Sequence, residues 1–307
     1  MTGGRGAVRR VAVIGGGVLG ASVAAALATT GDAVTLLTDG DGKTTPASAA
    51  SFAWVNARDK SPESYRRLNE DARRRHDESQ AGWFVGSGAI ADGTELPEDG
   101  YVDTSAFIAT HLDAARAAGA VIRTGTTVGS LDELRGAFDV VVVAGGTATA
   151  GLVRDLPGAA RRLSKTEGAD GFLARIAVDE HPVHRIVSVD GLQARPDGDG
   201  TVAVQSLAIE RSLRERRAAA SVDTVWPALR DEIATKLAWR VPASARVTVA
   251  RAARPHAADG LPVVGWVSDD AYVVLSHSGV TLAPLLAELV ARDLRGDEDP
   301  RLAAWRP

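Results

Sequence analysis

The feature that most constrains the fold is a run of glycines between an apolar strand and an apolar helix. Residues Val8 to Ile14 are β-branched or small, as in a strand, and residues Val18 to Thr29 favour a helix of little polarity. A second strand is predicted from Ala33 to Leu37. Because Gly15 to Gly20 interrupt the apolar run where the strand turns into the helix, the sequence predicts a βαβ unit, a typical piece of a doubly wound sheet.

These glycines fit the GxGxxG pattern in the context that gives it meaning, after a strand and at the opening of a helix. In this pattern Gly15 makes the turn, Gly17 lets the backbone approach a pyrophosphate, and Gly20 lets the helix pack on the strand. The first helical amides, at Val18 and Leu19, then face the anionic phosphates. The pattern therefore favours a dinucleotide site over a tight turn without a ligand.

An acidic residue about 20 positions further along is expected to bind the ribose hydroxyls. Asp39 lies 19 residues beyond Gly20 and is the candidate. Thr38 stands where a glutamate is usual, so the acid is displaced by one residue. No arginine occurs between positions 38 and 42, which disfavours a 2′-phosphate on that ribose.

Later segments predict the rest of an α/β fold. Asp103 is a plausible N-cap for a helix from Thr104 to Ala118, and the four valines from Val140 to Val143 read as a strand buried on both faces. The paired glycines Gly145 and Gly146 follow and allow a ligand to approach the backbone closely. From about residue 163 to 205, short strands separated by Asp/Gly turns indicate an antiparallel sheet. We therefore expect a Rossmann-like domain with a parallel sheet plus a smaller α+β substrate domain with an antiparallel sheet.

Composition excludes several classes of function. Thirty-five Lys plus Arg against 39 Asp plus Glu leave a net charge of −4, so a nucleic-acid partner is not expected. The chain has no cysteine, which excludes disulfides, thiolate catalysis and a flavin linked through sulfur. His181 and His184 are separated by Pro182, so no helix aligns them as metal ligands, and no metal site is expected.

The N-terminal apolar run after Arg9 and Arg10 imitates a signal sequence, but the glycines at positions 15 to 20 argue against export. No other stretch is long and apolar enough for a membrane span. The sequence therefore predicts a cytoplasmic protein.

Four separated segments together resemble one protein family. They are the opening βαβ unit, the run Gly100-Tyr101-Val102-Asp103, the strand from Val140 to Gly146, and a C-terminal pair of motifs, Arg254-Pro255-His256-Ala257-Ala258-Asp259-Gly260-Leu261-Pro262-Val263-Val264-Gly265 and Ser276-His277-Ser278-Gly279-Val280-Thr281-Leu282-Ala283-Pro284. In this order they are similar to the FAD-dependent D-amino-acid oxidase family, in particular its glycine oxidase and sarcosine oxidase-like members. Ser276 departs from the family, which usually has glycine there.

The resemblance implies bound FAD. We expect it to be held without a covalent bond, because the chain has no cysteine for a thioether link, the alternative being a histidyl link. Gly279, Val280 and Thr281 would contact the flavin, with a helix N-terminus at Thr281 near the charge that reduced flavin gathers. His277 would support the same loop. The resemblance places Ser48 and Ser51 in a loop that passes the phosphates and the ring, the alternative being a flexible surface linker.

The resemblance also implies a substrate contact at Arg254. The matching arginine in glycine oxidase-like enzymes holds the substrate carboxylate, and a guanidinium suits that role because it offers two parallel donors. The alternative is a structural pair with Asp259 or a backbone carbonyl. The family organisation places residues 1–80, 100–160 and 246–307 in the FAD-binding domain and residues 81–99 and 161–245 in the substrate domain.

The function implied is oxidation of the C–N bond of an amino acid or secondary amine to an imine, by hydride transfer to N5 of FAD. Two alternatives stay open at this point: a non-catalytic flavin- or nucleotide-binding subunit, and an NAD-linked dehydrogenase. The chain is short for the family at 307 residues, with the loss expected in the middle. We therefore expect a wide cleft, or a homodimer or partner subunit that completes it.

Overall fold

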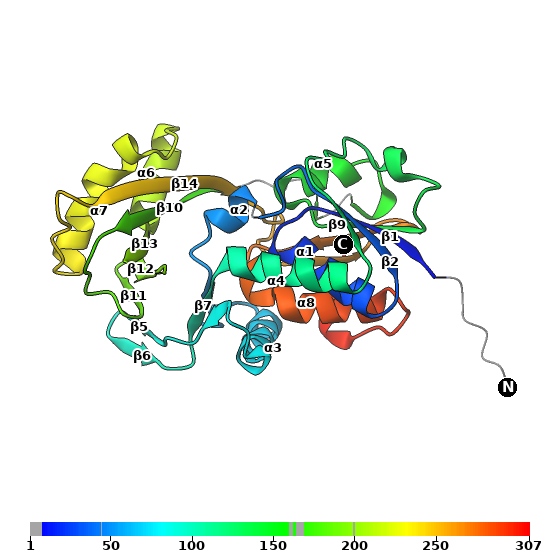
Figure 1. The fold of residues 1–307 in the computed structure, drawn as a ribbon, viewed down its shortest axis with the longest axis horizontal. Coiled ribbons are helices and arrows are strands. Elements are labelled where there is room, and N and C mark those ends of the chain that lie inside the picture. Colours follow the sequence, from blue (N-terminus) through cyan, green and yellow to red (C-terminus); the bar gives the residue numbers. More distant parts are fainter. Residues whose placement is uncertain (1–7, 44, 160–161, 164–168, 199) are drawn as a thin grey trace.

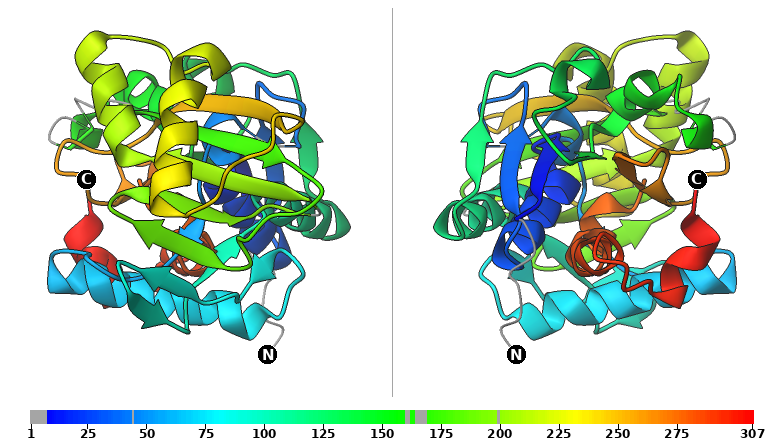
Figure 2. Two further views of the ribbon diagram at one scale, coloured as in Figure 1. Left: turned by 90° about the vertical axis from the view of Figure 1, so that its left-hand side faces the viewer. Right: turned by 90° about the vertical axis from the view of Figure 1, so that its right-hand side faces the viewer.

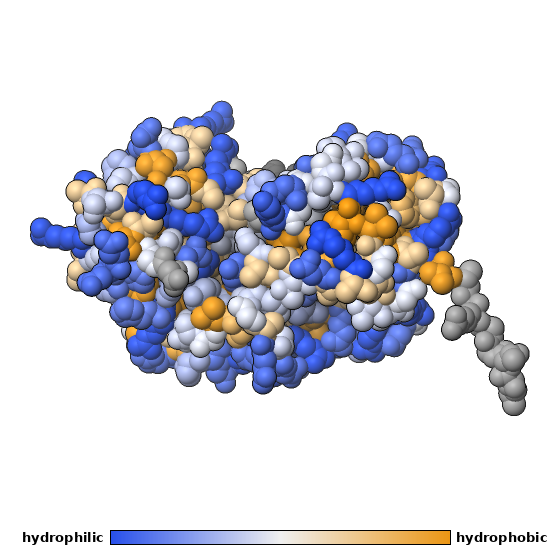
Figure 3. All heavy atoms as spheres, in the orientation of Figure 1, coloured by the Kyte–Doolittle hydropathy of each residue, from blue (hydrophilic) through white to orange (hydrophobic). Residues whose placement is uncertain are grey.

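Two sheets at opposite ends of an elongated molecule organise the chain (Figure 1). The computed structural model describes residues 8–43, 45–159, 162–163, 169–198 and 200–307. One end holds a parallel sheet wrapped by helices, and the other holds a larger twisted sheet covered on its outer side. Figure 3 shows that the face seen in this orientation is mostly polar, with apolar residues in scattered patches.

The first sheet has the order β15 (Val263–Trp266), β16 (Ala271–Leu275), β9 (Val140–Val143), β1 (Arg10–Ile14), β2 (Ala33–Leu37) and β8 (Val121–Arg123). All neighbouring pairs are parallel except β15 with β16 at one edge. Chain order and spatial order diverge between β1 and β9, because β1 lies between β9 and β2. Such a switch point is where open α/β sheets bind ligands.

Helices cover both faces of this sheet, as a central strand of four valines requires. Alternate residues of β9 enter two separate cores: Val140 and Val142 enter one, and Val141 and Val143 the other. On the first face lie α1 (Val18–Thr29), α4 (Thr104–Ala117) and α8 (Gly279–Asp293), with α3 (Glu63–Ser79) packed on α8. On the second lie the short α5 (Thr149–Val153) and the 3₁₀ turns η1 (Leu131–Leu134) and η3 (Pro157–Ala159).

The second sheet has the order β14 (Arg246–Arg254), β10 (Ala169–Ala177), β13 (Thr201–Ser206), β12 (Leu192–Pro196), β11 (Ile186–Val189), β5 (Ala89–Ala91) and β6 (Thr94–Leu96). Its pairs are antiparallel except β11 with β5. Helices α6 (Leu207–Arg216) and α7 (Val222–Lys236) lie across its outer face (Figure 2, left). The predicted fold class is confirmed.

A small third sheet of β3 (Trp54–Val55), β7 (Gly100–Val102) and β4 (Phe84–Val85) lies beside α3 (Figure 1). Gly100 is required here, because a Cβ at this position would lie 2.5 Å from the Val85 carbonyl oxygen. The remaining short elements are α2 (Pro46–Ala49), η2 (Gly146–Ala148) and η4 (Pro300–Trp305).

Several local predictions are confirmed and others differ. Helix α1 spans the predicted residues, and Asp103 caps α4 by accepting from the amides of Ser105 and Ala106. Helix α8 begins at Gly279, two residues before the N-terminus expected at Thr281. The segment from 86 to 100 contains the β5–β6 hairpin.

The domain boundary expected at residue 246 does not coincide with the sheets. Strand β14 pairs over its full length with β10, so residues 246–254 lie in the antiparallel sheet rather than with the parallel one. Nine residues of β14 are paired with nine residues of β10, and this pairing makes the segment part of the antiparallel sheet. Arg254 therefore stands at the end of a strand of the second sheet.

Candidate active site

One continuous cavity of about 370 Å³ joins the two sheets. It begins at the carboxyl ends of β1, β2 and β9 and reaches the end of β14. It brings together most of the residues singled out from the sequence: Gly15, Gly17, Val18, Leu19, Asp39, Ser48, Ser51, Gly145, Gly146, Arg254, His277, Gly279 and Val280. Two lie outside its lining, Gly20 and Thr281.

Each of the three glycines of the GxGxxG pattern occupies its position for a different physical reason. Gly15 has φ +109°, and a Cβ there would lie 2.3 Å from the Ala144 carbonyl oxygen, so only glycine makes this turn. At Gly20 a Cβ would lie 1.8 Å from the Gly15 carbonyl oxygen, which makes Gly20 the position of helix–strand packing. Gly17 meets no backbone: its Cβ would project to 3.1 Å from Thr45 Oγ1, on the cavity wall. Gly17 thus leaves room for a ligand.

The N-termini of two helices open onto this cavity. Among the described residues no side chain caps α1 after Gly17, and none caps α8 after Ser278. The first backbone N–H groups of a helix have no intrahelical acceptor and carry the positive end of its dipole. Both helix ends can therefore donate to an anion or to a polarised oxygen in the cavity.

Serine is a preferred N-cap residue, yet Ser278 does not cap α8 because its hydroxyl is engaged elsewhere. Tyr65 OH donates to Ser278 Oγ at 2.7 Å, and Lys60 Nζ donates to it at 3.2 Å. Burial raises the pKa of Tyr65 and lowers the pKa of Lys60. These two residues, which the sequence did not single out, keep the end of α8 open.

His76, on α3, fixes the start of α8 from the opposite side. Its Nε2 lies 3.2 Å from the Val280 carbonyl oxygen and 3.0 Å from that of Thr281. Since both partners are acceptors, Nε2 must carry the proton. Burial lowers the pKa of His76 to about 4, so the ring is neutral near pH 7.

Strand β2 ends at the cavity, with Asp39 exposed on its rim. The predicted acid therefore lines the cavity at the end of β2, and its contact with a ribose stays a prediction. On the facing loop, Thr45 Oγ1 donates to Ser48 Oγ at 3.0 Å. Ser51 also lines the cavity, and its Oγ accepts from the Ala53 amide at 3.1 Å. The stretch of this loop from Pro46 to Ala49 is helical.

The other end of the cavity is formed by His277 and Arg254. Burial lowers the pKa of His277 to about 4, and the nearby charge of Arg254 acts in the same direction. His277 is thus neutral near pH 7. Thr281 is buried behind this loop, where its Oγ1 donates to the Trp54 carbonyl oxygen at 3.4 Å.

Arg254 has a partner that the sequence did not indicate. Its Nη2 donates to Glu210 Oε1 at 2.8 Å and its Nη1 donates to Glu210 Oε2 at 3.2 Å. Glu210 is on α6, 44 residues away in the chain. Of the two partners considered from the sequence, Asp259 binds Arg162 instead, at 3.0 Å. A backbone carbonyl does contact Arg254, because its Nη2 donates to the Phe172 oxygen at 3.4 Å. No sequence pattern marks Glu210, because the contact depends on how α6 returns over the sheet.

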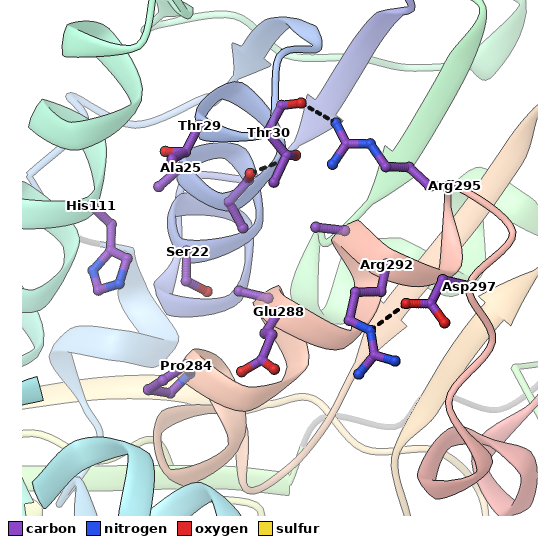
Figure 4. Close-up of a pocket in the computed structure, with 13 residues that line it drawn as sticks. Ser22, Ala25, Thr29, Thr30, His111, Pro284, Glu288, Arg292, Arg295 and Asp297 are labelled. Carbon is purple, nitrogen blue, oxygen red and sulfur yellow. Dashed lines mark hydrogen bonds and ion pairs between the residues drawn. The ribbon is translucent and has the colours of Figure 1, made fainter. Parts of the chain in front are cut away.

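A second hollow, of about 470 Å³, lies between α1, α4 and α8 and does not touch this cavity (Figure 4). Its floor is made of small side chains such as Ala25 and Ala287, and at its rim Arg292 is paired with Asp297. Arg292 bonds to Asp297 and Arg295 bonds to the Thr30 carbonyl oxygen, so these cations are already paired (Figure 4). The cavity at the strand ends is therefore the candidate site.

The described residues contain no group of three or more His, Cys, Asp or Glu side chains arranged to hold a metal ion. None of the helices in the described ranges combines the length and the apolarity needed to cross a membrane.

Comparison with known proteins identifies the family. The model of the DAO family, described as FAD dependent oxidoreductase, matches residues 10–87 and 81–292, and the chain belongs to this family. It is an FAD-dependent oxidoreductase. A search of curated proteins finds none that matches the sequence.

Solved structures share the fold at low identity. Glycine oxidase from Bacillus cereus ATCC 14579 has a TM-score of 0.72 and 16% identity over 97% of this chain and 98% of its own. L-Amino acid deaminase from Proteus myxofaciens has a TM-score of 0.76 and 16% identity over 99% of this chain and 94% of its own. Iminodiacetate oxidase from Chelativorans sp. BNC1 has a TM-score of 0.71 and 18% identity over 97% of this chain and 99% of its own. The chain thus spans nearly all of these structures from end to end. The shortened middle expected from the sequence stays a prediction.

The cavity fits FAD on observations independent of that match. Gly17 provides the space that a pyrophosphate needs, and the open end of α1 provides donors for it. The open end of α8 can stabilise negative charge on a flavin ring. Asp39 is placed for ribose hydroxyls.

Proposed function

We propose that this protein oxidises the C–N bond of an amino acid or secondary amine to an imine, with FAD as the acceptor of the hydride. The observation that carries the proposal is the continuity of the cavity: cofactor-type groups of the parallel sheet and Arg254 of the antiparallel sheet line the same space. The structurally similar proteins include a glycine oxidase and an iminodiacetate oxidase, which supports this class of substrate.

Bound FAD supplies the electron acceptor, at flavin N5, for the hydrogen on the carbon next to nitrogen. The protein then has to hold that carbon in place and exclude water. The end of β14 and the loop before α8 line the cavity together, and these two segments would position the substrate carbon. His277, neutral near pH 7, adds no charge that would repel or trap an amine there.

The open end of α8 supports the same chemistry. Its amides lie at Gly279 and Val280, which line the cavity, and they can donate to the part of the flavin that becomes negative on reduction. His76 and Tyr65 hold this end without capping it. No acid–base pair is required of the protein when the amine enters in its neutral form.

The proposal is tested by mixing the purified holoprotein anaerobically with a panel of amino acids and N-alkyl amino acids. We expect at least one of them to bleach the flavin absorbance and to yield, after hydrolysis of the imine, the matching carbonyl compound. A protein that keeps its flavin oxidised with every amine in the panel would contradict the proposal and favour a non-catalytic flavin-binding subunit.

A further inference from the structure

Two arginines of the second sheet project from the same face of it. Arg175 on β10 and Arg195 on β12 are both paired with Ala203 of β13, the strand that lies between them. Residues that face each other on neighbouring strands project to the same side of a sheet. Arg175 and Arg195 therefore flank the small side chain of Ala203, on the face opposite to the core under α6 and α7.

Asp197, directly after β12, joins the two guanidinium groups. Its Oδ1 accepts from Arg195 Nη1 at 2.6 Å, and its Oδ2 accepts from Arg175 Nε at 2.6 Å. Burial alone would raise the pKa of Asp197, but the charges of Arg195 and Arg175 outweigh it and lower the pKa, so the carboxylate is ionised near pH 7. Arg195 also lies over the ring of Tyr101, with its Cζ 4.5 Å from the ring centre. Arg175, Arg195 and Asp197 thus form one connected group, the Asp197 cluster.

The Asp197 cluster binds the backbone of the loop that lines the cavity between β2 and β3. Nη1 and Nη2 of Arg175 both donate to the Ala49 carbonyl oxygen at 3.2 Å, and Nε of Arg195 donates to that of Phe52 at 2.7 Å. Each of these two loop residues directly follows a serine that lines the cavity. The α2 turn of this loop lies between the two sheets (Figure 1). The second sheet therefore holds a loop whose serines line the same space as the glycine turn of the first sheet.

The path of this loop depends on contacts from outside it. Ala53 has φ +58°, a left-handed conformation that alanine rarely adopts. Helix α2 is a single turn, and so short a helix is not stable by itself. Backbone of this kind persists only where its surroundings fix it. The Asp197 cluster supplies two of these contacts, and the Val102 amide supplies another by donating to the Ala53 carbonyl oxygen at 3.1 Å.

We propose that Arg175, Arg195 and Asp197 are positioning residues for FAD, which hold the loop of Ser48 and Ser51 in place for contact with the cofactor. The inference concerns the cofactor and is independent of the substrate. A purely structural role predicts a different result: loss of the cluster would lower the free energy of unfolding and leave the affinity of the folded protein for FAD unchanged.

The test measures the Kd of FAD and the free energy of unfolding of the same proteins. Fluorescence of the FAD that is released when the holoprotein is diluted gives the Kd, and denaturant unfolding followed by circular dichroism gives the stability. The test variants are Arg175→Met, Asp197→Asn and the double variant. Arg175 is chosen over Arg195 because its side chain is 33% exposed rather than 3%, so that its replacement is expected to fold. The control is Arg185→Met, the same change just before β11, at an arginine that pairs with Glu95.

We expect Arg175→Met and Asp197→Asn each to raise the Kd of FAD about tenfold, the size of effect that follows the loss of a hydrogen bond to a charged group. Because both changes act through one cluster, the double variant should lose little more than either single variant, rather than about a hundredfold. Arg185→Met should keep the wild-type Kd. Arg175→Lys keeps a cation beside Asp197 and a donor for Ala49, so it should recover part of the affinity.

Three outcomes would overturn the inference. A folded Arg175→Met protein with the wild-type Kd would show that the cluster does not position the cofactor loop, whatever its effect on stability. An equal loss of affinity in Arg185→Met would show that the effect is not specific to the cluster. Independent losses in the double variant would show that Arg175 and Asp197 do not act together. FAD binding that responds as expected, in a protein that oxidises no amine, would support the cluster and contradict only the proposed oxidation.

Discussion

The two ends of the cavity recognise ligands by different means. At the parallel sheet the groups that can contact a ligand are mostly backbone, at the glycine turn and at the open ends of α1 and α8. Few charged side chains line this end. At the antiparallel sheet they are side chains, with Arg254 held by Glu210 and Gln205. The backbone groups of the first end are set by the local path of the chain. The paired side chains of the second end are set by contacts between segments that are distant in the sequence.

The largest effect is expected from filling the space at the backbone end. Gly17→Val puts a branched side chain beside Thr45 Oγ1, in the path expected for the pyrophosphate, so the protein should purify without flavin. Circular dichroism should show that it still folds. Gly82→Val is the control, since nothing lies within 4 Å of a Cβ at Gly82, and it should stay yellow. A Gly17→Val protein with full flavin content would mean that the ligand does not pass this turn.

At the side-chain end we expect the next largest effect, on stability. Arg254→Leu leaves Glu210 buried without its partner, and Glu210→Leu leaves the guanidinium unpaired; each should cost about 3 kcal/mol of unfolding free energy. The double variant should lose much less than the sum of the two, because neither charge remains. Denaturant unfolding of the four proteins measures this. Additive losses would show that the pair does not form in solution.

A pH effect of about 2 kcal/mol between pH 7 and pH 5 should come from His76. Its pKa in the folded protein, about 4, lies below its ordinary value of 6.5. The unfolded chain therefore binds a proton in this range and the folded one does not, so stability falls as the pH falls below about 6.5. His76→Gln keeps a donor for the carbonyls of Val280 and Thr281 and removes the titration. Its stability should change less with pH than that of wild type, and equal slopes would contradict the neutral buried histidine.

The smallest effect concerns the open end of α8. Tyr65→Phe removes the 2.7 Å hydrogen bond to Ser278 and keeps the ring against Trp305. Ser278 then keeps only the bond from Lys60 and can cap α8 and compete with the flavin, which should weaken FAD binding by about 1 kcal/mol, roughly fivefold in Kd. Adding Ser278→Ala should restore the affinity, because alanine cannot cap. If the double variant binds as weakly as Tyr65→Phe, capping is not the cause.

The backbone end could be predicted from sequence because its determinants are local. Gly15 to Gly20, the Asp103 cap and the four valines of β9 each act within a few residues of where they stand. The β5–β6 hairpin has a signal of the same local kind in the dipeptide Asp92-Gly93, which is typical of tight hairpin turns. Both residues have positive φ, as such a turn requires.

The side-chain end could not be predicted in the same way. Arg254 was singled out, but its partner Glu210 is brought to it by the pairing of β14 with β10 and by the path of α6 after β13. Tyr65 and Lys60 likewise reach Ser278 across more than 200 positions of the chain. No periodicity or motif encodes such contacts, since each depends on how two distant elements pack.

The central claim is that the cavity from Asp39 to His277 holds FAD without a covalent bond. The absorption spectrum of the purified protein, followed by that of the supernatant after denaturation, tests it most directly. The account predicts a yellow protein whose flavin appears in the supernatant as FAD, since the chain has no cysteine for a thioether link. A colourless protein that binds NAD and not FAD, or a flavin that stays with the precipitated chain, would contradict it.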